Sequence, residues 1–86
     1  MKKKKVTQKA QPEKEKFLKE LGKRVRKIRL SKGLTQTQVG NKMDSDLRTI
    51  RRIEKAEINA SIFLVNEIAN ALEVSIEELL NGMGKF

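Results

Sequence analysis

Three arginines stand at helical spacing within the segment DLRTIRRIEK, residues 46–55. In a helix, Arg48, Arg51 and Arg52 would share one face, and two isoleucines would share another. The guanidinium fork of arginine can meet O6 and N7 of guanine together, and one such pair discriminates between bases by about 1–3 kcal/mol. The segment therefore predicts a helix, about residues 47–55, that packs on a core and offers cations to a polyanion.

Charge is divided unevenly along the 86 residues. Residues 1–16 have a net charge of +5 and residues 17–55 one of +8, whereas residues 56–86 have one of −4. A chain that is basic at one end and acidic at the other points its basic end at a polyanion. The alternative interpretation is that the net positive charge serves only to keep the protein soluble.

The residue types that most often perform catalysis or bind metals are scarce. Histidine and cysteine are absent, which removes disulfides, the common zinc sites and nucleophile–histidine catalysis. Tryptophan and tyrosine are also absent, so there is no stacking platform for single-stranded nucleic acid. We therefore expect no enzyme activity, no cofactor and no metal. No apolar run approaches the roughly 18 residues of a membrane span, so we expect a cytoplasmic protein without membrane contact.

The elements that position the arginines follow from apolar periodicity and capping residues. Residues 1–16 predict a disordered, lysine-rich arm, and residues 17–86 predict one folded domain. Helices are expected over about 17–32, 36–43, 47–55, 62–73 and from 76 to about 80. Gly33 should stop the first helix, and Thr35, Ser61 and Ser75 should cap later ones. The expected fold is an all-α, compact five-helix bundle.

The second and third expected helices are separated by only about three residues, so they must cross steeply. This is the helix-turn-helix arrangement, in which the second helix enters the major groove of DNA. Gly40 fits a close crossing, because a glycine within a helix costs about 1 kcal/mol relative to alanine and needs a packing reason. A tolerated surface glycine is the alternative.

Residues 21–80 resemble the Xre or phage-repressor (lambda-repressor-like) helix-turn-helix family, without a visible gap. The segments that carry the resemblance are LGKRVRKIRLSKGLTQTQVGNKM, RTIRRIE and NEIANALEVSIEELL. The resemblance implies a five-helix fold and sequence-specific binding to double-stranded DNA, usually as a dimer. It implies a transcriptional regulator, either a repressor or a controller of a mobile element.

The resemblance also implies roles for individual residues. The helix-turn-helix core positions are held by Val39, Gly40, Met43, Ile50 and Ile53. The positions presented to base edges are held by Leu47, Arg48, Arg51 and Arg52, with neutralisation of phosphate alone as the alternative for each arginine. Contacts to phosphate are predicted for Lys27, Arg29, Thr35, Gln36 and Lys55, with plain solvated charge as the alternative for Lys27. Arg29 and Glu54 match a pair that often forms a buried salt bridge between the first and third helices.

Four residues depart from the family's pattern. Asp44 stands where the turn usually has glycine, although aspartate tolerates left-handed geometry better than most residues. Ser45 replaces a buried aliphatic residue, and Lys55 replaces a frequent asparagine. Leu47 either touches a thymine methyl group or turns inward to replace what Ser45 lacks, and the missing aliphatic slightly favours the inward orientation.

The sequence leaves two kinds of protein partner open. A homodimer through the C-terminal helices would use the excess apolar face of the fourth helix together with Ile76, Leu79, Leu80, Met83 and Phe86. These residues could equally close the core of the monomer. The alternative function is an antitoxin that represses its own operon and also binds a toxin protein, for which only residues 1–16 are free. The basic arm either follows a DNA groove or adds non-specific affinity.

Overall fold

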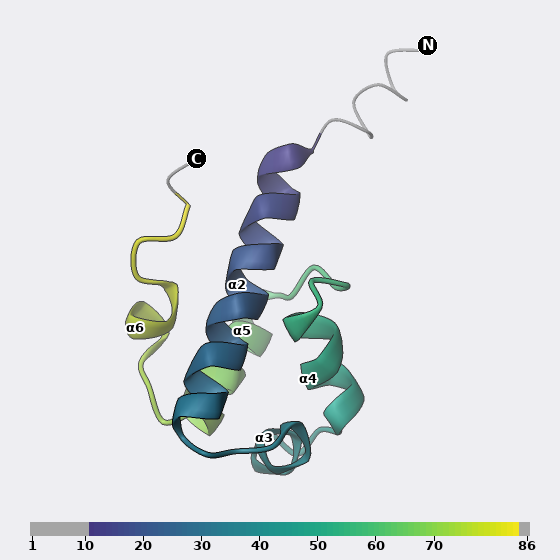
Figure 1. The fold of residues 1–86 in the computed structure, drawn as a ribbon, viewed down its shortest axis with the longest axis vertical. Coiled ribbons are helices and arrows are strands. Elements are labelled where there is room, and N and C mark those ends of the chain that lie inside the picture. Colours follow the sequence, from purple (N-terminus) through teal and green to yellow (C-terminus); the bar gives the residue numbers. More distant parts are fainter. Residues whose placement is uncertain (1–10, 85–86) are drawn as a thin grey trace.

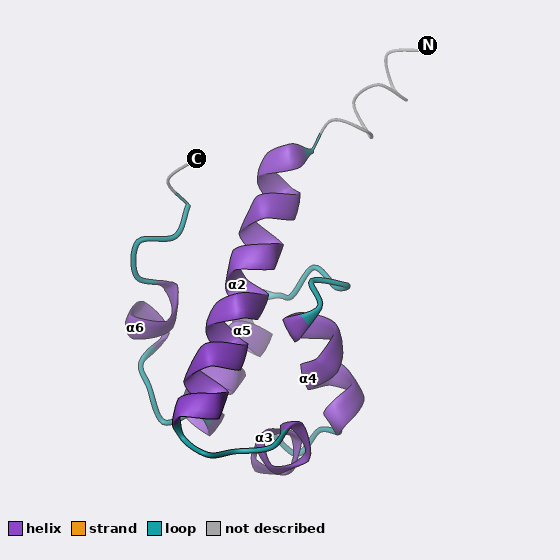
Figure 2. Ribbon diagram, in the orientation of Figure 1, coloured by secondary structure: helices purple, strands orange, loops and turns teal. Residues whose placement is uncertain are grey.

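The computed structural model describes residues 11–84. Its helices are, in order, α2 (Pro12–Ser31), α3 (Gln36–Lys42), α4 (Leu47–Glu54), α5 (Ile62–Ala71) and α6 (Ile76–Leu80). Loops join them, and no strand forms between residues 11 and 84 (Figure 2). The predicted all-α fold of five helices is therefore confirmed.

The longest helix, α2, runs through the middle of the bundle (Figure 1). In this view α3 and α4 lie below and beside α2, α6 lies on its other side and α5 lies behind it. α4 packs on α2 and α3, whereas α6 packs on α2 and α5. The first turns of α2 extend beyond the other helices (Figure 1). The helix with the arginines thus stands at one side of the bundle with its outer face open.

α2 begins earlier than the sequence predicted, at Pro12 instead of Phe17. A proline suits the first position of a helix, where a backbone N–H would have no partner. Two glutamates in the first turn interact favourably with the positive end of the helix dipole. Residues 12–16 are therefore helical, which corrects their assignment to the disordered arm. Residues 1–10 of that arm lie outside the described residues.

The other helix ends agree closely with the predicted caps. The side chains that accept a backbone N–H at a helix start are Thr35, Asp46, Ser61 and Ser75. Gln38 completes the first capping box, because its Oε1 accepts the Thr35 N–H at 2.8 Å. α2 ends before Gly33, which has a φ of +71°, and the Leu34 N–H returns to the Arg29 carbonyl. The helix boundaries are thus set largely by local hydrogen bonds.

The core lies between α2, α4, α5 and their neighbours. Its buried apolar side chains are Leu21, Val25, Val39, Met43, Ile50, Ile53, Val65, Ile68, Ala69, Ala71, Leu72 and Leu79. Four of the apolar residues assigned to the helix-turn-helix core are among them, and none of these four is more than 8% exposed. Burial of a side chain of this size contributes about 1.5–3 kcal/mol. These side chains therefore fix α3 and α4 against the rest of the bundle.

Candidate DNA-binding surface

The turn between α3 and α4 is regular despite its unusual residues. Asp44 takes the left-handed conformation, with a φ of +60°, as its position in the turn requires. The Ser45 N–H then donates to the Gly40 carbonyl at 2.8 Å, which ends α3 with a Schellman motif. The Ser45 hydroxyl is 3.1 Å from that of Thr49 in α4. Both departures from the family's pattern are therefore accommodated, the second through a polar contact where an aliphatic side chain is usual.

Two glycines allow α4 to approach its neighbours closely. A Cβ atom at Gly40 would lie 2.9 Å from the carbonyl carbon of Asp46, so α3 crosses the start of α4 almost backbone to backbone. A Cβ atom at Gly22 of α2 would lie 2.6 Å from the Ile53 carbonyl oxygen and 2.7 Å from that of Glu54. The sequence pointed to Gly40 but not to Gly22. The only signal for Gly22 was a glycine within a helix next to a buried leucine.

A buried polar network joins three helices behind the outer face of α4. The Glu54 carboxylate accepts from Arg29 Nε at 2.6 Å and from Nη2 at 3.1 Å, so the implied salt bridge is present. The remaining terminal nitrogen of Arg29, Nη1, donates to the Leu34 carbonyl at 2.9 Å. Gln36 of α3 donates to the same carboxylate at 3.1 Å. Between residues 11 and 84, no buried side-chain nitrogen or oxygen lacks a partner, so the network is satisfied.

The start of α4 is organised by Asp46. One carboxylate oxygen accepts the backbone N–H groups of Arg48 and Thr49, and the other lies 3.3 Å from Nη2 of Arg48. The Thr49 N–H has the largest influence and lowers the pKa of the Asp46 carboxyl below its ordinary value of 3.8, while desolvation acts in the opposite direction. The carboxylate is therefore charged at neutral pH and serves both as helix cap and as partner of Arg48.

The outer face of α4 is strongly cationic. Arg48, Arg51, Arg52 and Lys55 are all exposed, and their spacing places them within an arc of about 100° on one helix face. Arg48 and Arg52 line the same surface hollow, together with Asp46. Arg51 and Arg52 have no ion pair within the described part of the chain. Two guanidinium groups are thus available to an external acceptor.

Leu47 does not turn into the core. It is half-buried, but it does not belong to the buried core or to the partly buried apolar side chains that pack against it. The slightly favoured inward orientation is therefore wrong. Leu47 lies at the first position of α4, beside Arg48.

The residues predicted to contact phosphate do not all lie together. Thr35 and Gln36 stand at the start of α3, and Lys55 is exposed at the end of α4. Lys27, in contrast, faces α6, where it lines a hollow with Glu78 and Leu79. Arg29 is the fifth of these residues, and its side chain is only 9% exposed because it is used in the network. Arg29 is therefore poorly placed for phosphate, and Lys27 lies apart from the other three residues.

Within residues 11–84, no group of three or more acidic side chains could hold a metal ion. None of the helices described is long and apolar enough to cross a membrane. The outer face of α4 and the start of α3 therefore form the principal candidate surface.

Comparison with known proteins identifies the same arrangement elsewhere. The chain matches a helix-turn-helix family over residues 25–79. The wild-type restriction-modification controller protein C.Esp1396I is 34% identical to it, with a TM-score of 0.69 and coverage of 74% of this chain and 86% of that chain. The controller protein C.AhdI from Aeromonas hydrophila is 29% identical, with a TM-score of 0.69 and coverage of 72% and 90%.

More distant structures share the fold. The clp gene regulator ClgR from C. glutamicum is 22% identical, with a TM-score of 0.71 and coverage of 74% of this chain and 83% of that chain. No curated protein sequence matches. The family match covers more than half of the 86 residues and includes the whole of α3, the turn and α4. The chain therefore belongs to the Xre-like helix-turn-helix family of DNA-binding regulators.

Proposed function

We propose that this protein regulates transcription by placing α4 in the major groove of an operator. The supporting observation is the outer face of α4, where exposed arginines stand on a helix whose inner face is fixed by Ile50, Ile53 and the Glu54 network. A rigid support of this kind keeps guanidinium groups in register with base edges. Arg48 is nearest the helix N-terminus, the end that enters the groove in this motif.

We assign the other contacts from their position around α4. Leu47 lies beside Arg48 and can meet a thymine methyl group, because it is not used by the core. Thr35, Gln36 and Lys55 lie at the ends of α3 and α4, where phosphates would flank the groove. Gln36 is held by Glu54 through one amide hydrogen, which leaves the other for a phosphate oxygen.

The assignment of Arg48 is tested by selecting bound sites from random duplex DNA. We expect the wild-type protein to enrich a two-fold symmetric motif. Arg48→Ala should lose the base preference at one symmetric pair of positions, a loss of about 1–3 kcal/mol per base pair. Lys14→Ala, which removes a cation from the exposed start of α2, is the control and should keep the motif. An unchanged motif with Arg48→Ala would exclude this residue from base readout.

We further propose a homodimer, but through α5 and not through α6. Leu79 is fully buried, and Ile76, Leu80 and Met83 pack against the core. These residues therefore complete the hydrophobic core of the monomer. Phe86 lies outside the described residues. Ile62 and Phe63, at the start of α5, are 68% and 67% exposed and are the strongest apolar candidates. The controller protein C.Esp1396I, a relative at 34% identity, was crystallised as a tetramer with its 35-base-pair operator, which supports self-association.

Substitution of the start of α5 tests this dimer. Ile62→Ser with Phe63→Ser should convert a dimer to a monomer in sedimentation equilibrium and should weaken operator binding without changing the helical circular dichroism. Leu30→Ser changes another exposed apolar residue, on α2, and should leave the dimer intact. Dimeric behaviour of the double variant would place the interface elsewhere. In the dimer, the two copies of α4 should lie about 34 Å apart, one turn of DNA.

The comparisons do not favour the alternative function of an antitoxin. The comparisons include controller proteins and transcriptional regulators, and none of these descriptions points to a toxin partner.

A further inference from the structure

α2 carries a second cationic surface that the reading face of α4 does not include. Its members are Lys16, Lys19, Lys23, Arg26 and Lys27, and they are called the α2 stripe below. At 3.6 residues per turn these five positions fall within an arc of about 100° along three turns of the helix. No acidic residue of α2 falls within that arc. All five side chains are exposed, and none has an ion pair within residues 11–84.

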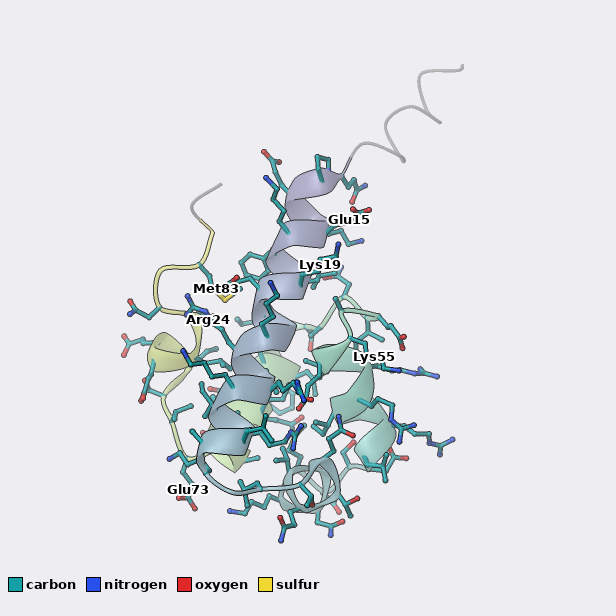
Figure 3. The ribbon with its side chains drawn as sticks, viewed as in Figure 1. Glu15, Lys19, Arg24, Lys55, Glu73 and Met83 are labelled. Carbon is teal, nitrogen blue, oxygen red and sulfur yellow. The ribbon has the colours of Figure 1, made fainter. Side chains whose placement is uncertain are left out.

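The neighbouring cations of α2 are used differently. Arg24 leaves the helix toward α6, where it bonds Glu20 at 3.2 Å and the Leu79 carbonyl at 3.1 Å (Figure 3). Arg29 is buried against Glu54. The chain therefore pairs the arginines that face its own elements and leaves the stripe unpaired. Keeping like charges on adjacent helical turns is unfavourable by a few tenths of a kcal/mol per pair, which an external anion would offset.

The two edges of the stripe have different surroundings. On the α6 side, Lys23 and Lys27 border a hollow that also contains Glu20 and Glu78. On the α4 side lie Lys19 and Arg26, close in helical phase to Gly22, which touches α4. Lys19 leaves α2 on that side, opposite Arg24 (Figure 3). The α6 edge of the stripe is thus countered by Glu20 and Glu78, whereas the α4 edge presents Lys19 and Arg26, with Glu15 one turn before Lys19 on the same side (Figure 3).

We propose that the α2 stripe binds the phosphate backbone of duplex DNA beside the turn that α4 reads. The inference rests on the proposed function, because α4 in the groove brings the flanking duplex to the α4 edge of the stripe. Such contacts carry no base information but add affinity and release counterions. Lys19 and Arg26 are the residues nearest to that duplex. The stripe extends the footprint of the protein beyond its operator half-site.

Operator length provides the test. Binding is measured on the selected operator alone and on the same operator with about ten additional base pairs, one helical turn, on each side. We expect the wild-type protein to prefer the longer duplex at low salt. Lys19→Gln with Arg26→Gln should remove most of that preference, about a tenfold loss of affinity, and should lower the salt slope by about 0.9 for each phosphate that is no longer neutralised.

A charge-matched variant separates this effect from net charge. Lys14→Gln with Lys42→Gln also removes two cations. Lys14 lies outside the arc of the stripe, and Lys42 is paired with Glu73 at 3.4 Å on another part of the surface. This control should keep the preference for the longer duplex. Equal losses in both variants, or wild-type binding that is independent of duplex length, would overturn the proposal.

The proposed function is tested separately from the α2 stripe. A wild-type protein that binds the operator no better than a scrambled duplex of equal length contradicts sequence-specific regulation. The effect of duplex length on the scrambled sequence would then still decide whether the stripe binds the backbone.

Discussion

Glu54→Leu is expected to destabilise the fold by about 3–5 kcal/mol, because it leaves the Arg29 guanidinium buried without its carboxylate. The side chains of this pair are only 5% and 9% exposed, so water cannot readily replace the missing partner. Domains of this size are typically stable by about 5–15 kcal/mol, so the variant should lose a large part of its stability. Urea unfolding followed by circular dichroism measures the change in the free energy of unfolding.

The double variant Arg29→Met with Glu54→Leu is the control for this result. It replaces both charges by apolar side chains, and such replacements of buried pairs are often neutral or stabilising. Most of the stability should therefore return. Operator affinity should stay low, since Gln36 loses the carboxylate that holds it. If the single variant loses less than about 1 kcal/mol, the range of an exposed ion pair, the pair does not stabilise the helix-turn-helix.

Gly22→Ala is expected to destabilise the fold by about 1–3 kcal/mol, although alanine is the better helix former by about 1 kcal/mol. The added methyl group would meet two backbone carbonyls of α4, at 2.6 and 2.7 Å, and backbone atoms cannot rotate away as a side chain can. α4 must shift from α2, so operator affinity should fall as well. Urea unfolding and operator titration together measure both effects.

Lys14→Ala is the matched control for Gly22→Ala. It places an alanine in the exposed first turns of the same helix, which extend beyond the other helices (Figure 1). Its free energy of unfolding should stay within about 0.5 kcal/mol of the wild type, the usual range for surface changes. If Gly22→Ala matches or exceeds wild-type stability, the two helices have room to separate, and the close approach is not required for folding.

The sequence predicts those parts of the fold that depend on neighbouring residues. Thr35, Ser61 and Ser75 cap helices through bonds to residues three positions away, so their roles can be read without the tertiary structure. The apolar stripe of α4 is likewise local. The lysine-rich composition of residues 12–16 predicts disorder, but a proline followed by two glutamates starts α2 at Pro12.

What the sequence does not predict depends on contacts between distant elements. Gly22 matters only because the carbonyls of residues 53 and 54 come to lie against it. Leu79 could have served a dimer or a monomer core, and only the packing of α6 decides for the core. Lys27 and Arg29 are two residues apart, yet one faces α6 and the other α4. The sequence predicts phosphate contacts for both, because it identifies a basic residue but does not say toward which element its side chain points.

The exposed arginines of α4 have a consequence for how this protein can evolve. Within the described residues, Arg48 pairs with Asp46, two positions before it, and Arg51 and Arg52 form no ion pair. Substitutions at these positions should therefore cost little stability, since surface changes are usually within about 0.5 kcal/mol. The residues that hold the fold, such as Glu54 and Gly22, form a separate set. New operator preferences can arise by drift at the surface, one base contact at a time, while the scaffold stays unchanged.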